Sequence, residues 1–299
     1  MKRLIIALIM ILGTSSMMFA QTNTGTMPYE GSYHYYQVNG GTRVGTNTYD
    51  WKVFLDNKTA EATLGTHFVF TDASGATLGG ATPTTPANTE AKIYIKWLVA
   101  NTGAESYYVS IGESNDHCTT NRLLQVTVVA NTFDIYAELT GTEDACATVD
   151  NPVEDKGTVG DNSDDNFGLT ARNYVVKAHN LATNAVTAKT VAWNYTFTLV
   201  DKKTGTTTDE GIVLNITVDG VAKTSGSKID IAEGTAESNI SVSYTTNSNR
   251  QDEDLDLILT ITSGADALGT EDADGKADSK NEVKYLVRAV PATTGITTD

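Results

Sequence analysis

The residues best placed to do chemistry in this 299-residue chain are acidic. Asp272, Asp274 and Asp278 lie together in the run 271–278, with Gly275 among them. Several carboxylates in one short loop supply the oxygen ligands that Ca²⁺ prefers. The run lacks the D-x-D-x-D-G series of an EF-hand, and no flanking helices are expected. A calcium site is therefore one hypothesis, and a solvated acidic turn that keeps the protein soluble is the other.

The only cysteines are Cys118 and Cys146. If the chain is exported through an oxidising compartment, a disulfide between them is the natural prediction. Closing a loop of about 28 residues would stabilise the fold by roughly 3 to 4 kcal/mol. Two free thiols are the alternative. Two cysteines without paired histidines do not make a metal site.

Aromatic side chains form a second candidate site in the run 33–36. On a strand, Tyr33 and Tyr35 share one side and Tyr36 takes the other, so part of the run must be exposed. Exposed tyrosines could bind a carbohydrate. Packing in the core or across strands is the alternative for the same residues.

Signals for catalysis are missing. The histidines His34, His67, His117 and His179 are scattered singly, and no H-E-x-x-H, G-x-S-x-G or phosphate-loop motif is present. Paired carboxylates that meet only in the fold stay open. We expect no enzyme, no catalytic residues, and no cofactor beyond the candidate Ca²⁺.

The elements that would position these residues are strands. Runs rich in β-branched and aromatic residues alternate with Gly, Asn, Thr, Asp and Pro turns. No window shows the apolar i, i+3, i+4, i+7 stripe of a helix. Short strands without helices between them predict an all-β chain of two tandem immunoglobulin-like antiparallel β-sandwiches. The expected strands are 32–38, 49–55, 67–70, 92–99, 106–111, 123–129, 133–139, 172–179, 191–200, 212–218, 228–231, 239–245, 255–262 and 282–290.

The length fits roughly two domains. We expect a signal peptide at 1–20, a first sandwich at 21–131, a second at 132–291 and a tail at 292–299. The acidic stretch 140–168 is assigned to a loop of the second sandwich, because a linker there would leave that sandwich without a first edge strand. A linker between the domains is the alternative.

The first twenty residues have the pattern of an export signal. Lys2 and Arg3 precede the apolar run 4–12, and Ala20 ends the segment before Gln21. Nine apolar residues are too few to span a bilayer, and no later stretch approaches 18, so we expect no membrane insertion. The net charge of −16 argues against nucleic acid and anionic membranes as partners.

The strand segments also carry a family resemblance. The runs 31–38, 48–53, 91–97, 107–113 and 124–128 resemble the PKD-like β-sandwich, and the half from Phe133 onward is similar to the C-terminal half of the same proteins. Such proteins are secreted or surface proteins of Bacteroidota, of the kind associated with type IX secretion and gliding. The resemblance brings no catalytic residues. No separate sorting domain follows Val290, which leaves the periplasm open beside the cell surface.

The resemblance implies a non-catalytic structural or interaction protein of the bacterial envelope or surface. Its expected partners are envelope or surface proteins, including an outer-membrane anchor of the secretion machinery, or further copies of itself. The alternative is an extracellular carbohydrate-binding or calcium-dependent adhesion module.

Overall fold

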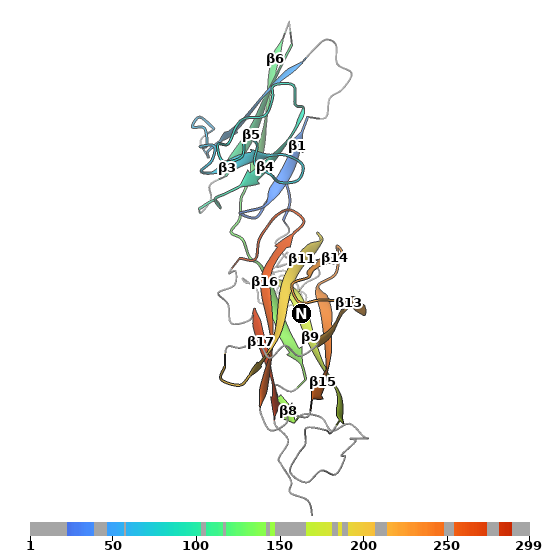
Figure 1. The fold of residues 1–299 in the computed structure, drawn as a ribbon. Coiled ribbons are helices and arrows are strands. Elements are labelled where there is room, and N and C mark those ends of the chain that lie inside the picture. The colour runs from blue at the N-terminus through green and yellow to red at the C-terminus, as the bar shows by residue number, and fades with distance from the viewer. Residues whose placement is uncertain are drawn as a thin grey trace, which may run out of the picture.

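Two β-sandwiches lie end to end in the computed structural model, the first above the second (Figure 1). Together they form an elongated molecule. The structure describes residues 23–38, 47–56, 58–102, 106–115, 118–141, 144–146, 166–180, 185–186, 191–206, 214–247, 254–273 and 281–288.

The first sandwich contains two three-stranded antiparallel sheets. One has the order β1 (Tyr33–Gln37), β4 (Lys92–Trp97), β3 (Phe68–Thr71). The other has the order β2 (Thr48–Phe54), β5 (Tyr107–Ser114), β6 (Thr119–Val126).

Alternation along the strands builds the core of this sandwich. In β2, Tyr49, Trp51 and Val53 are buried and the residues between them are exposed or half-buried. In β4, the same period of two buries Ile93, Ile95 and Trp97. Side chains alternate between the faces of a strand, so each sheet presents one apolar face to the other. The rest of the core comes from Tyr36, Ala62, Phe68, Phe70, Tyr107, Val109, Ile111, Val126 and Val128.

The second sandwich is larger, and its first strand is β7 (Phe133–Thr140). β7 pairs antiparallel with β9 (Asn166–Asn180). Val129 still belongs to the first sandwich, so a short linker of three residues, 130–132, joins the two. The rest of the sheet has the order β10 (Ala185–Val186), β9, β15 (Glu237–Asn247), β12 (Leu214–Val218), β13 (Val221–Lys223).

The facing sheet has the order β14 (Lys228–Ile231), β11 (Trp193–Lys203), β16 (Leu255–Asp266), β17 (Glu282–Arg288), β8 (Asp144–Cys146). Only β8 pairs parallel among its strands, beside β17. β11 and β16 form the longest ladder of this sheet, with a register shift between Thr196 and Phe197. Aromatic residues fill the space between the sheets, among them Trp193, Tyr195, Phe197, Tyr174 and Tyr285.

The predicted fold class is confirmed: the chain is all-β, with two immunoglobulin-like sandwiches in tandem and no helix in the described residues. Each predicted strand overlaps an observed one. The short strands β8, β10 and β13 were not predicted. Parts of the acidic stretch 140–168, expected to be a loop, are strand: β8 and the start of β9. Within the described residues no helix has the length and apolarity to cross a bilayer.

Candidate functional site

The two sandwiches meet through a polar junction, and Asn23 is its centre. The Nδ2 of Asn23 donates to Thr270 Oγ1 at 2.9 Å and approaches Asp266 Oδ2 at 3.3 Å, both in the second sandwich. Its Oδ1 lies 2.8 Å from His34 Nε2 and accepts from Ser32 Oγ at 3.1 Å, both in the first. One side-chain amide therefore bridges the two sandwiches.

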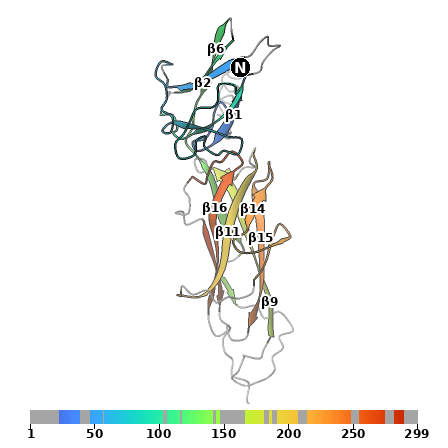
Figure 2. The same cartoon turned by 45° about the horizontal axis from the view of Figure 1, so that its top comes forward.

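The second sandwich contributes a turn to this junction. Residues 267–270 follow β16 and reach the start of β1, as the close approach of the sandwiches in Figure 2 shows. Asp266 Oδ1 accepts from the backbone N–H groups of Leu268 and Thr270, both at 2.9 Å, which fixes the turn. The backbone N–H of Tyr33 then donates to Leu268 O at 2.8 Å.

The linker itself is short and hydrogen-bonded. Tyr29 and Val129 form a parallel bridge in the first sandwich, and Phe133 already begins β7 in the second. Between them, Asn131 Nδ2 donates to Glu271 O at 2.8 Å, and its Oδ1 accepts from Phe133 N at 2.9 Å. The linker is therefore tied to Glu271, the residue directly after the turn that contacts β1.

Burial sets the electrostatics of the junction. His34 is buried, and desolvation lowers its pKa to about 4. Asp266 is buried as well, and desolvation raises its pKa, against the lowering effect of its hydrogen bonds to Thr270, Asn23 and Leu268. Burial disfavours the charged form of each group. The junction is thus built to hold a neutral imidazole.

An apolar groove of about 540 Å³ opens on the first sandwich, between β1 and β6. Trp51, Val109 and Ile111 form its buried floor. The rims are formed by residues of β1 and its neighbourhood on one side and of β6 on the other: Gly25, Thr26, Tyr35, Tyr36, Gln37, Val38, Arg122, Leu123 and Leu124. Such a groove can take an extended apolar segment.

The three candidate tyrosines of β1 have different environments. Tyr36 is buried in the core and accepts from Trp97 Nε1 at 3.1 Å, so its prediction as an exposed aromatic is wrong. Tyr33 is half-buried, with its ring against Gly75 and Gly269. Tyr35 alone is largely exposed, at 55%. It packs edge-on against Tyr94 across the β1–β4 ladder.

A cation adds to the environment of Tyr35. The Nζ of Lys92 lies 4.5 Å from the Tyr35 ring centroid and 5.0 Å from that of Tyr94. This is a cation–π arrangement, and it occupies ring surface that a sugar would stack on.

The predicted disulfide between Cys118 and Cys146 is not formed. Cys118 is an exposed free thiol before β6 in the first sandwich. Cys146 belongs to β8 of the second sandwich. Between them β6 and β7 each extend over eight residues, or roughly 26 Å apiece, and they lie in different sandwiches. Proximity in sequence therefore does not become proximity in space.

The candidate calcium residues are only partly visible. Asp274 and Asp278 lie outside the described residues. Asp272 is half-buried, and Asn281 Nδ2 donates to its Oδ2 at 3.4 Å. Among the described residues no group of three or more His, Cys, Asp or Glu side chains is placed to hold a metal.

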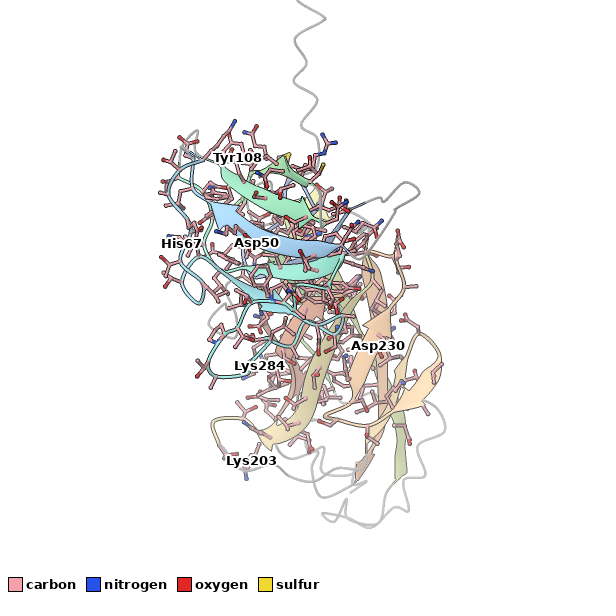
Figure 3. All side chains as sticks on the ribbon, turned by 90° about the horizontal axis from the view of Figure 1, so that it is seen from above. Asp50, His67, Tyr108, Lys203, Asp230 and Lys284 are labelled. Atoms are coloured by element: carbon pink, nitrogen blue, oxygen red, sulfur yellow. The ribbon has the colours of Figure 1, made fainter. Side chains whose placement is uncertain are left out.

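The titratable side chains labelled in Figure 3 are spread over both sandwiches. Asp50, His67 and Tyr108 lie on the first sandwich and Lys203, Asp230 and Lys284 on the second, and these labelled residues do not converge on one point (Figure 3). One buried pair stands apart: His179 Nδ1 lies 2.5 Å from Asp134 Oδ2 across the β7–β9 ladder. Both side chains are buried at the pairing of two strands, and we assign the pair a structural role.

No protein-family model and no curated protein matches the chain. Solved structures match at the level of tandem β-sandwiches. A chimeric titin Z1Z2 is 10% identical, with 88% of this chain and 89% of that chain covered and a TM-score of 0.32. The titin Z1Z2 domains in a complex with telethonin are also 10% identical, over 91% and 93%, with a TM-score of 0.27.

Domains 5–6 of the S-layer protein SbsC are 12% identical, over 89% of this chain and 94% of that chain, with a TM-score of 0.21. At such identities the likeness concerns the fold alone. The sheet order of this chain itself defines its fold class: two immunoglobulin-like sandwiches in tandem.

The junction is the part of the site that sequence reasoning missed. Asn23 and Thr270 are 247 positions apart and sit in no motif. His34 offered one signal, a polar residue at a core-facing position of a strand, but nothing in the sequence names its partners.

Proposed function

We propose that this is an exported, non-catalytic structural or interaction protein of the bacterial cell envelope or surface, in which two sandwiches act as a rigid spacer. The observation that carries this function is the Asn23 junction. Domains joined by small polar interfaces move relative to each other by default. Here Asn23, Thr270 and Asp266 would each lose a hydrogen-bond partner if the sandwiches separated, at a cost of about 1 to 3 kcal/mol per group.

The envelope assignment rests on the export pattern of residues 1–20 and on the exclusion of nucleic acid by charge. In this role the partners are envelope or surface proteins, with attachment at the surface through the type IX route, or retention in the periplasm. The two sandwiches would set a fixed distance between a partner at one end and a partner at the other.

Rigidity is tested by distance measurement between spin labels. Cys118 is a native label site on the first sandwich, and Val221, 58% exposed on β13, accepts a cysteine on the second. In a Cys146→Ser, Val221→Cys protein we expect one narrow distance distribution. Asn23→Ala should broaden it. A broad distribution in the parent protein would refute the spacer function.

Location is tested in cells. Fractionation and cross-linking of the native protein should recover it, without residues 1–20, with the envelope and bound to an envelope protein or to itself. Recovery in the cytoplasm with the leader intact would contradict the assignment.

Tyr35 favours a second candidate, a carbohydrate-binding adhesion module. Its exposed ring is the type of surface that stacks on a sugar, although Lys92 competes for it. Co-sedimentation with insoluble polysaccharides that is lost in Tyr35→Ala would support this function. If the protein binds none of the glycans tested, the carbohydrate-binding function is ruled out.

A further inference from the structure

In the described part of the first sandwich, the segment before β1 does not pair with β1; it pairs parallel with the residues after β6, through the bridge of Tyr29 and Val129. In the second sandwich, the strand order β9–β15–β12 corresponds to β1–β4–β3 of the first, and β11–β16–β17 corresponds to β2–β5–β6. β7 covers the outer edge of β9. No described strand pairs with the outer edge of β1. The apolar groove lies at this position.

The backbone of β1 is oriented to receive a strand there. Tyr33 donates its N–H away from β4, to Leu268 O. In an antiparallel ladder the backbone groups of every second residue point to the same edge. The N–H and C=O of Tyr35 therefore face the groove side of β1.

The exposure of side chains on β6 also indicates that a strand can be added at this position. Val126 of β6 is buried in the core, so Leu124 and Arg122, two and four residues earlier, also point between the sheets. Yet Leu124 is 42% exposed, whereas Val109 and Ile111 on the neighbouring β5 are 3% and 6% exposed. β1 is the last described strand of the facing sheet on this side, and its residues line the same groove as Leu124.

We propose that residues 289–299 of a second copy of this chain add as a strand beside β1, antiparallel to it, and fill the groove. This inference rests on the proposed interaction function and names one of its partners, the chain itself. The geometry follows β7, which pairs antiparallel with β9 at the equivalent position. Strand addition obtains affinity from main-chain hydrogen bonds and specificity from pockets for alternate side chains.

The segment must come from another copy because it starts too far away. It follows Arg288, and Val287 pairs with Leu255 at the first residue of β16. The other end of β16, Asp266, lies at the junction. β16 has 12 residues and spans about 36 Å. A segment of about 11 residues extends at most roughly 40 Å, which leaves no length to pair with its own β1.

The composition of the segment suits the groove. The sequence Ala-Val-Pro-Ala-Thr-Thr-Gly-Ile-Thr-Thr-Asp is rich in β-branched residues, which favour strands. It contains Asp299 and no Lys or Arg. Arg122 is the charged residue that lines the groove, so the charges are complementary.

Such a contact is heterologous: the distal end of one molecule binds the first sandwich of the next. An interface of this kind does not close on itself in a dimer, so it generates linear chains unless a rotation closes a ring. The protein would then assemble head to tail. The rigid junction would fix the angle between successive copies.

Binding of the segment is tested with a synthetic peptide of residues 289–299 and the protein truncated after Arg288. Trp51 lines the groove, so its fluorescence reports occupancy. We expect saturable binding that weakens at least tenfold in Leu124→Glu. Val221→Glu, at a still more exposed apolar residue on β13, is the control, and this variant should bind as the parent does. Absence of saturable binding, or equal loss in both variants, would overturn the proposal.

Assembly is tested by sedimentation of the mature chain over a concentration series. We expect the average molecular mass of the parent protein to rise with concentration. The truncated protein and Leu124→Glu should stay monomeric. The thermal unfolding of Leu124→Glu should match that of the Val221→Glu control. A chain that is monomeric throughout, or one that assembles equally after truncation, would refute strand addition by 289–299. The spacer function would survive that result, since it depends on the spin-label distances instead.

Discussion

The Nδ2 of Asn23 donates a hydrogen bond to the Oγ1 of Thr270 at 2.9 Å, joining the segment before β1 to the turn after β16. Thr270 is fully buried. A side chain in an N-terminal segment thereby holds a loop of the second sandwich against the first, and the relative orientation of the two sandwiches becomes part of the fold.

Thr270→Val tests the worth of this contact. The change keeps the shape of the side chain and removes the acceptor, leaving Asn23 Nδ2 with the longer contact to Asp266. We expect the free energy of unfolding to fall by about 1 to 2 kcal/mol and the spin-label distribution to broaden. Thr217→Val on β12, outside the junction, is the control for replacing a hydroxyl by a methyl group. The same broadening in both variants would contradict a role for the junction.

His34 should make stability depend on pH. Burial lowers its pKa from 6.5 to about 4 in the folded protein, so the unfolded chain takes up a proton at higher pH than the folded chain does. Stability is then full above pH 6.5 and falls as pH drops from 6.5 toward 4, by about 3 kcal/mol. Asp266 acts in the opposite direction, because burial raises its pKa.

Denaturant unfolding at several pH values measures this effect. His34→Gln keeps a donor for Asn23 and should lose most of the decline between pH 6.5 and 4. His67→Gln, in the same sandwich, should retain it. If the free energy of unfolding of His34→Gln falls as much between pH 6.5 and 4 as that of the parent, the pH dependence belongs to other groups.

The buried pair of His179 and Asp134 should be a large contributor to the stability of the second sandwich. Both side chains are almost fully buried, and their contact is 2.5 Å long. His179→Ala leaves the Asp134 carboxylate buried without this partner, and we expect a loss of about 3 kcal/mol.

Lys177→Ala is the matched control for that change. Lys177 lies on the same strand, β9, and forms a 2.7 Å ion pair with the half-exposed Glu138. Because exposed pairs contribute little, its loss should cost less than about 1 kcal/mol. Equal costs for the two substitutions would argue against a special role for the buried pair.

Cys118 should be dispensable. It is exposed and free, so Cys118→Ser should change the free energy of unfolding by no more than about 0.5 kcal/mol. Maleimide should label it in the folded protein without reductant. A loss near 3 kcal/mol, together with labelling only after reduction, would instead indicate a disulfide.

The sequence alone predicted the strands and the sandwich class, because both follow from local alternation. Tyr49, Trp51 and Val53 repeat at a period of two, and the same residues are buried in β2. This period identifies a strand without any knowledge of which strands it pairs with. It failed for β8, β10 and β13, which have two or three residues and are too short to show a period.

The contacts between the sandwiches were decided by tertiary structure. Asn23 meets Thr270 only after β16 has placed its turn beside β1, and no local rule relates residues 247 positions apart. For the same reason the expected pairing of Cys118 with Cys146 failed, since the strands between them extend the chain instead of closing it. Whether Tyr35 is exposed and Tyr36 buried depended on which sheet faced β1, and on the strand that is absent from its outer edge among the described residues.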